Sequence, residues 1–219
     1  MDDIKTIELT FVNAFLLKVN EGFILIDTGL AMHREKLENE LAAEGCLPGN
    51  LKLVIVTHGD FDHTGNCAML QKKYSCKIAM HPHDLPMVTE GVRVRRKMKS
   101  FRNKVFFIIR ILFKKKFTFD KFSPDILLAD GQRLDEYGLS ATVLHLPGHT
   151  KGSVGILTDE GNLFSGDTFT NNYKPNTASL IENQSDLNNS LSRLKALPVK
   201  MIWPGHGKPF DMEEVSSLL

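Results

Sequence analysis

Four side chains that can bind a metal ion lie within one six-residue segment, at His58, Asp60, Asp62 and His63. The apolar, β-branched run at 53–56 precedes them and predicts a buried strand, and the residues after 64 follow a helical pattern. The four side chains are therefore expected on a strand-to-helix loop, where a rigid scaffold commonly holds catalytic groups. Imidazole mixed with carboxylate suits Zn, Fe or Mn better than Ca or Mg.

Three later segments each deliver one more such side chain into a glycine-containing turn that follows a hydrophobic strand. The additional candidates are His149, Asp167 and His206, each next to a glycine. Glycine permits a tight turn and a close approach of other groups, so each strand can end with a polar side chain aimed at a common centre. Any one of these turns would be ordinary alone, but all of them together indicate a shared metal centre.

This set of motifs resembles the metallo-β-lactamase superfamily, whose pattern is His-x-His-x-Asp-His on a loop, then a distant His, a Gly-Asp and a final His. The resemblance runs from Asp27-Thr28-Gly29, after an early strand, to Pro204-Gly205-His206-Gly207. It implies an α+β fold, an αββα sandwich of two mixed β-sheets flanked by helices. A single domain of this kind would span 1–219, with the metal centre along one edge of the sheets.

The resemblance also implies a role for each candidate residue. His58 and His149 would bind the first of two divalent ions, and Asp62, His63 and His206 the second. Asp167 would bridge the two ions, and Asp27 would support the ligands from behind without binding a metal.

One position departs from the common pattern, because Asp60 stands where most members have the second histidine. Asp60, Asp62 and Asp167 give three carboxylates against two divalent ions, so the pair is less positive and a weaker Lewis acid. The added hard oxygen shifts the metal preference from Zn, the first expectation, towards Fe or Mn. The flavodiiron branch carries a glutamate at this position. Because aspartate is shorter than histidine, the alternative is that Asp60 does not reach the metal.

The implied chemistry is hydrolysis by a hydroxide that bridges two metals and attacks an ester, thioester, lactone or phosphodiester, on a small, anionic or acyl-chain substrate. Asp62 could also orient this nucleophile or accept its proton. Thr168 and Asn171 are candidate substrate contacts or ordinary loop residues. The alternatives are a di-iron redox protein that reduces oxygen or nitric oxide, and a non-catalytic metal-binding protein.

Composition predicts a cytoplasmic protein. With 219 residues, 42% of them hydrophobic, and a net charge of +1, the chain can bury a sizeable core without disulfides. Cys46, Cys67 and Cys76 form no spaced metal motif and are predicted to be reduced thiols. The acidic amino terminus lacks an apolar leader, which argues against a secreted antibiotic-resistance enzyme.

Apolar patterns predict strands near 4–9, 12–19, 22–26, 52–57, 76–80, 126–129, 140–146, 153–158 and 162–165. Helices are predicted near 32–45 and 64–74, after a cap at Ser185, and from Asp211 to the end. His81 and His83 match no family ligand position and are interpreted as a strand end and a helix cap.

The segment at about 84–125 is expected to be a helical cap over the metal cleft. Between 93 and 121 there is a single acid, Asp120, and the other 25 acidic residues face only 15 basic ones elsewhere, a net of −10. The apolar run at 105–113 is far too short for the ~20 residues that span a bilayer. Alternatives are a solvated basic face, or a surface that contacts an anionic membrane or lipid-like substrate; the clustered aromatics argue against nucleic acid. The twelve basic residues of this segment are Arg93, Arg95, Arg96, Lys97, Lys99, Arg102, Lys104, Arg110, Lys114, Lys115, Lys116 and Lys121.

Overall fold

The computed structural model describes residues 4–94, 97–98 and 119–218. The first of its two main sheets comes mainly from the amino-terminal half of the chain. Six strands run in the order β1-β2-β3-β4-β5-β7. The pairs β1-β2 and β2-β3 are antiparallel, whereas β3, β4, β5 and β7 are parallel, so the sheet is mixed. The strands are β1 (Ile4–Leu9), β2 (Val12–Val19), β3 (Gly22–Ile26), β4 (Leu51–Ile55), β5 (Lys77–Met80) and β7 (Ile126–Leu127).

The second sheet comes from the carboxy-terminal half and is also mixed. Its order is β14-β13-β10-β9-β8, with β11 paired to β10. Only the β10-β13 pair is parallel. The strands are β8 (Ala141–His145), β9 (Val154–Thr158), β10 (Asn162–Asn171), β11 (Asn176–Thr177), β13 (Met201–Gly207) and β14 (Phe210–Asp211), while β6 (Lys97–Met98) and β12 (Leu180–Ile181) form a separate pair.

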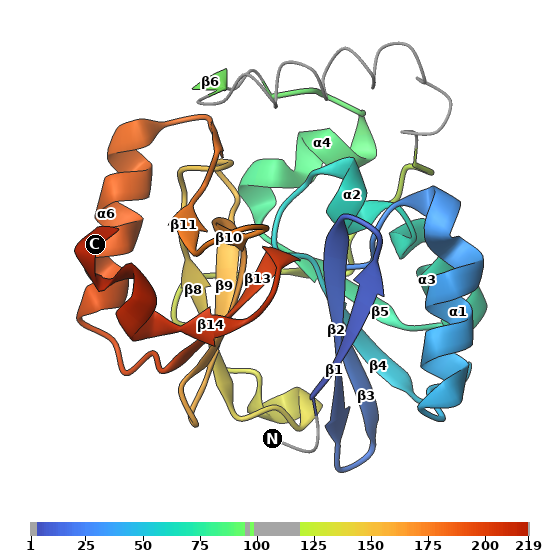
Figure 1. Ribbon diagram of the computed structural model, residues 1–219. Helices are drawn as coiled ribbons and strands as arrows, with labels where there is room; N and C mark the ends of the chain where they lie inside the picture. The colour runs from blue at the N-terminus through green and yellow to red at the C-terminus, as the bar shows by residue number, and fades with distance from the viewer. Residues whose placement is uncertain (1–3, 95–96, 99–118, 219) are drawn as a thin grey trace.

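Helices cover the outer faces of the two sheets, and Figure 1 shows α1 and α6 on opposite sides of them. The alternation of β2 shows how the layers form, because successive side chains of a strand point to opposite faces. Ala14 and Leu16 join the core under α1, whereas Phe15 and Leu17 join the core between the sheets. The helices are α1 (Arg34–Ala43), α2 (Phe61–Thr64), α3 (Cys67–Tyr74), α4 (Leu85–Thr89) and α6 (Gln184–Lys195), with 3-10 turns η1 (Ala31–His33), η2 (Pro82–Asp84), η4 (Asp135–Tyr137) and η5 (Met212–Leu218).

Three hydrophobic clusters match the four layers. One lies between α1, α3 and the first sheet, one between the sheets, and one between the second sheet and α6. In the third cluster α6 buries Leu187, Leu191 and Leu194 on one face, as their helical spacing predicts. The αββα arrangement expected from the sequence is thus confirmed.

Three details of the predicted helices are wrong. The helix predicted from Asp211 is replaced by strand β14, which includes Asp211, and the 3-10 turn η5 (Met212–Leu218). Asn183, and not Ser185, caps α6, because its extended backbone lets the side chain accept hydrogen bonds from the amides of Ser185 and Asp186. The helix predicted at 64–74 begins only at Cys67, as α3, and the short helix α2 (Phe61–Thr64) precedes it. Gly65 lies at the break, where a Cβ would be 2.4 Å from the amide nitrogen of Ala31.

Most of the expected cap, including the basic residues from 99 to 116 and the apolar run at 105–113, lies outside the described residues. Within the described ranges, no helix is both long enough and apolar enough to cross a membrane.

Candidate metal centre

All seven predicted ligand residues meet at the edge where the two sheets adjoin. The loop after β4 supplies His58 and Asp60, and α2 supplies Asp62 and His63. From the other half, His149 lies in the loop between β8 and β9, Asp167 lies in β10 and His206 lies in β13. The parallel pairing of β10 with β13 places the last two side by side. Neither sheet holds the full set alone.

The first half of the centre consists of His58, Asp60 and His149, which offer ligand atoms within 4.8 Å of one another. The Oδ2 atom of Asp60 lies 3.1 Å from Nε2 of His149 and 3.4 Å from Nε2 of His58. The shorter carboxylate therefore does reach the space between the two imidazoles.

The second half consists of Asp62, His63 and His206, whose ligand atoms also lie within 4.8 Å of one another. Asp167 lies between the halves. Its Oδ1 is 3.4 Å from Nε2 of His63 and 3.3 Å from Nε2 of His206, while its Oδ2 is 3.5 Å from Nε2 of His149. One carboxylate oxygen thus faces each half, which is the placement expected of a bridging ligand.

Each of the four imidazoles is oriented by a hydrogen bond at Nδ1, so that Nε2 is directed into the centre. His63 donates to Asp27 at 2.8 Å, His149 donates to the carbonyl of Leu180 at 2.7 Å, and His206 donates to the carbonyl of Phe11. For His58, the partner is the Thr57 hydroxyl at 3.0 Å. Metal-binding histidines almost always donate their other ring N–H in this way.

The residues at this centre fit a pair of metal ions. Nε2 of His58, Nε2 of His63 and Oδ1 of Asp167 are buried and make no hydrogen bond to the described part of the chain. A buried polar atom without a partner is unfavourable by about 1–3 kcal/mol, so three of them in one place indicate a missing partner. Imidazole nitrogens with carboxylate oxygens are the donors that Zn, Fe or Mn accept.

The electrostatics of the site also favour cations. Burial would raise the pKa of Asp167, but His206, His63 and His149 hold it well below the usual range. Burial lowers the pKa of His206, but Asp167 and Asp62 outweigh it and raise the pKa to about 9. His63 shows the same balance, with Asp27 and Asp167 raising its pKa. Without metal, these histidines hold protons where ions would otherwise sit.

Asp27 lies behind the candidate ligands, and its role as their support stays a prediction. Its Oδ2 accepts hydrogen bonds from His63 and from the Thr57 hydroxyl, and its Oδ1 accepts one from the Thr57 amide. The residue is 1% exposed and has a positive φ of 58°, a conformation that aspartate and asparagine tolerate better than most residues.

Two buried supporting residues were missed by the sequence reasoning. Asp84 accepts hydrogen bonds from the amides of Gly59 and Gly152 and from the Thr150 hydroxyl, so it ties together the loops that carry His58 and His149. Asn13 donates to the carbonyls of Pro204 and Gly207 and ties the β1-β2 hairpin to the His206 strand. An acid directly after His-Pro-His at a helix start is the only sequence signal for Asp84; Asn13 has none.

The other residues singled out from the sequence are Thr168, Asn171 and His81. Thr168 is buried at 1% exposure in β10, and Asn171, at the end of β10, donates to the carbonyl of Lys208. Their role in substrate binding stays a prediction. His81 follows β5 and caps η2 by accepting a hydrogen bond from the amide of His83, so His81 alone is both the strand end and the cap, whereas His83 lies inside η2.

The chain is similar to several known metallo-hydrolases. It is 26% identical to the probable metallo-hydrolase YflN of Bacillus subtilis, over 86% of this chain and 76% of YflN. It is 25% identical to human acyl-coenzyme A thioesterase MBLAC2, over 94% and 76% of the two chains. A hydroxyacylglutathione hydrolase from Pelagibacter ubique is 26% identical over 72% of this chain and 52% of its own length.

A solved structure of TTHA1623 in a di-iron-bound form superposes with a TM-score of 0.73 at 25% identity, covering 97% of this chain and 96% of that one. The model of the metallo-beta-lactamase superfamily matches residues 7–206, so this chain, with its two mixed sheets and its His/Asp centre, belongs to that superfamily.

Proposed function

We propose that the protein is a binuclear metal-dependent hydrolase that cleaves an acyl thioester or a related ester. The observation that carries the proposal is the convergence of four imidazoles, each directed by a hydrogen bond at Nδ1, with three carboxylates on one centre. A purely structural cluster would not need so many buried nitrogen and oxygen atoms without hydrogen-bond partners.

The two halves of the centre divide the ligands between two ions. His58, Asp60 and His149 would hold one ion, and Asp62, His63 and His206 the other, with Asp167 shared. Divalent ions there would lower the pKa of water and stabilise negative charge on the carbonyl oxygen under attack. Zn is the first expectation, and Fe or Mn the alternatives, because Asp60 adds a hard oxygen donor.

The chain's own residues position the reaction. Asp27 fixes the ring of His63, and Asp84 fixes the two loops that carry His58 and His149. Asp62 is partly exposed, and its Oδ2 lies 3.7 Å from Nε2 of His206. We expect Asp62 to accept a proton from the attacking water.

The relatives favour thioesters among the candidate bonds. MBLAC2 is named as an acyl-coenzyme A thioesterase, and the Pelagibacter relative is a hydroxyacylglutathione hydrolase, whose substrate is also a thioester. A thioester requires no catalytic serine or cysteine here, because water is the nucleophile.

A second candidate function follows from Asp60. Its carboxylate oxygen lies between two imidazoles, as a ligand of an iron centre would, and TTHA1623 has been solved with two irons. An oxygen- or nitric oxide-reducing di-iron centre is therefore the alternative, and it would require a separate electron donor.

Elemental analysis of protein purified without added metal tests both candidates, together with assays on an acyl-coenzyme A, an acyl-glutathione and a phosphodiester. The variants are His58→Ala and Asp60→Ala, and the matched control is Asp211→Asn, at an exposed position in β14. About two ions per chain, with thioester hydrolysis lost in both variants and retained in the control, is the expected result.

Two other outcomes would contradict the proposal. Two irons with no hydrolysis, and a spectrum that changes on reduction, would support the redox alternative. A protein that retains no metal and hydrolyses nothing would point to a non-catalytic role for the fold.

A further inference from the structure

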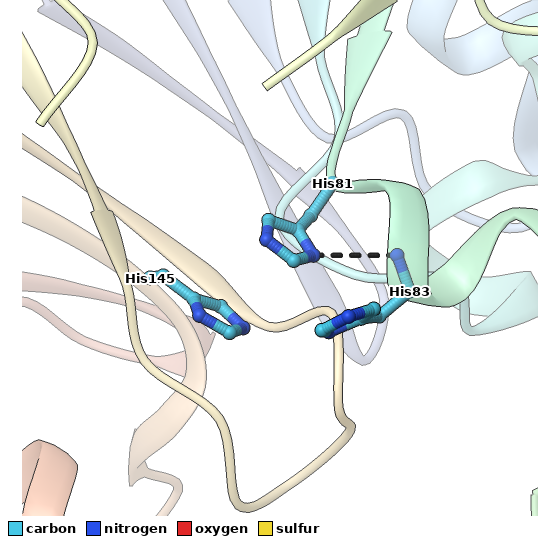
Figure 2. A group of neighbouring side chains, drawn as sticks. All are labelled: His81, His83 and His145. Carbon is cyan, nitrogen blue, oxygen red and sulfur yellow. Dashed lines mark hydrogen bonds between the residues drawn. The ribbon is translucent and has the colours of Figure 1, made fainter. Parts of the chain in front are cut away.

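Three histidines outside the seven-residue centre form a second cluster. His81 follows the carboxyl end of β5, His83 lies in η2 and His145 is the last residue of β8, so the cluster joins the two sheets (Figure 2). Each offers a ring nitrogen within 4.8 Å of the others. The rings of His81 and His145 are stacked, with centroids 4.0 Å apart and planes 11° apart, so one of these rings must turn before both can direct an in-plane nitrogen lone pair at one ion. The ring centroid of His83 lies 4.8 Å from that of His81.

The hydrogen bonds of this cluster leave ring nitrogens available. Nε2 of His145 lies 2.8 Å from the carbonyl oxygen of Lys151, and Nδ1 of His83 lies 3.4 Å from the same oxygen. Because a carbonyl can only accept, these nitrogens carry the protons, and the other nitrogen of each neutral ring keeps its lone pair. A carbonyl that orients an imidazole in this way is the usual support of a metal-binding histidine.

His81 completes the set. Its Nδ1 accepts only a long hydrogen bond, 3.3 Å, from the amide of His83, and Figure 2 shows this nitrogen facing the His83 loop. The side chain is 7% exposed. Burial, followed by the charges of His145 and His83, lowers the pKa of His81 to about 4, although Asp84 and Asp130 act in the opposite direction. The ring is therefore neutral, which is the form that binds metals.

We propose that His81, His83 and His145 form a third metal site that holds a single transition-metal ion. Imidazole ligands suit Zn, Ni and Cu, and affinity rises from Ni to Cu in the usual order. Three protein ligands leave at least one coordination position open to solvent, since His83 is exposed and His145 is partly exposed.

An ion at this site would tie η2 to the end of β8. Asp84, the last residue of η2, is the residue that holds the loops of His58 and His149 through Gly59, Thr150 and Gly152. The third site would therefore stabilise the scaffold of the catalytic centre without contributing a ligand to it. This inference does not depend on which bond the enzyme cleaves.

The test uses full-length protein whose dinuclear centre is first filled with Zn and which is then titrated with Cu(II). The variants are His83→Gln and His83→Gln/His145→Gln, and the matched control is His33→Gln, a partly exposed histidine elsewhere. The expected result is one additional copper per chain, with a mononuclear, nitrogen-coordinated electron paramagnetic resonance signal, in the wild type and the control. The variants should bind this ion at least about tenfold more weakly.

Thermal unfolding provides a second readout that does not involve catalysis. Copper at about 100 times the dissociation constant should lower the unfolding equilibrium constant about 100-fold in the wild type and not in the double variant. Equal copper binding by wild type and variants would overturn the proposal and indicate an adventitious ion only. If the double variant fails to fold, the single change at exposed His83 decides the question.

Discussion

Replacing Asp27 by asparagine should weaken metal binding and also lower the stability of the metal-free protein. The substitution keeps the shape of the side chain, and asparagine tolerates the positive φ of 58° at this position. Asp27 accepts three hydrogen bonds on two oxygens, from His63 at 2.8 Å and from Thr57 at 2.7 and 2.8 Å. Asparagine has a single oxygen, so at least one buried donor would face an N–H group.

The magnitude follows from these contacts. An unsatisfied buried donor, together with the lost charge, should lower the free energy of unfolding of the metal-free protein by about 2–3 kcal/mol. For a chain of this length that corresponds to a fall in Tm of about 4–12 °C. Because the carboxylate raises the basicity of His63, affinity for the ion at Asp62, His63 and His206 should fall about 10–100-fold.

The assay is a competition titration of the Asp27→Asn variant with a chromophoric zinc chelator, alongside thermal unfolding of chelated protein. Asp211→Asn serves as the control and should change stability by no more than about 0.5 kcal/mol, since its side chain is exposed. A variant that binds two ions as tightly as the wild type would refute the view that Asp27 acts through the His63 ring.

Four further predictions concern protons, packing and thiols. Because the pKa of His206 is raised to about 9 and that of His63 is also raised, metal binding near neutral pH should release roughly two protons, measured by calorimetry in buffers of different ionisation enthalpy. Because the folded state raises the pKa of His206 from 6.5 to about 9, the protonated imidazole stabilises the metal-free protein at low pH. This stability should be lost as the pH rises from 6.5 to about 9, which thermal unfolding at several pH values would measure. Gly205→Ala should reduce metal binding, because the added Cβ would lie 2.7 Å from Cε1 of His63 and 2.8 Å from Oδ1 of Asp167. Such an overlap costs about 1–3 kcal/mol, and elemental analysis of the variant would measure the lower metal content. The three cysteines are free and buried, and burial raises the pKa of the Cys46 and Cys76 thiols to about 12 and that of Cys67 further, so Ellman's reagent should react with them only after denaturation.

Much of the fold could be predicted because its strands carry their own pattern. β1, β2 and β3 have the predicted bounds, since β2 and β3 are buried on both faces and therefore appear in the sequence as short, nearly continuous apolar runs between turns. The α2-α3 break could not be predicted, because it depends on how closely Gly65 approaches Ala31 on another segment. A helical period reports which residues are buried, and it does not report which neighbour occupies the space.

The sequence by itself determined which side chains could bind metal, because imidazole and carboxylate chemistry belongs to the residues themselves. It predicted Asp167 and His206 in turns after strands, which was wrong, because β10 and β13 continue through these residues. Only the tertiary structure decided that Asp60 reaches the two imidazoles and which atoms orient the rings. The acceptors for His149 and His206 are the carbonyls of Leu180 and Phe11, the latter 195 residues away along the chain. Every residue has a backbone carbonyl, so the residue types in the sequence do not predict which carbonyls accept these hydrogen bonds. They arise only when the tertiary packing brings the two backbone segments together.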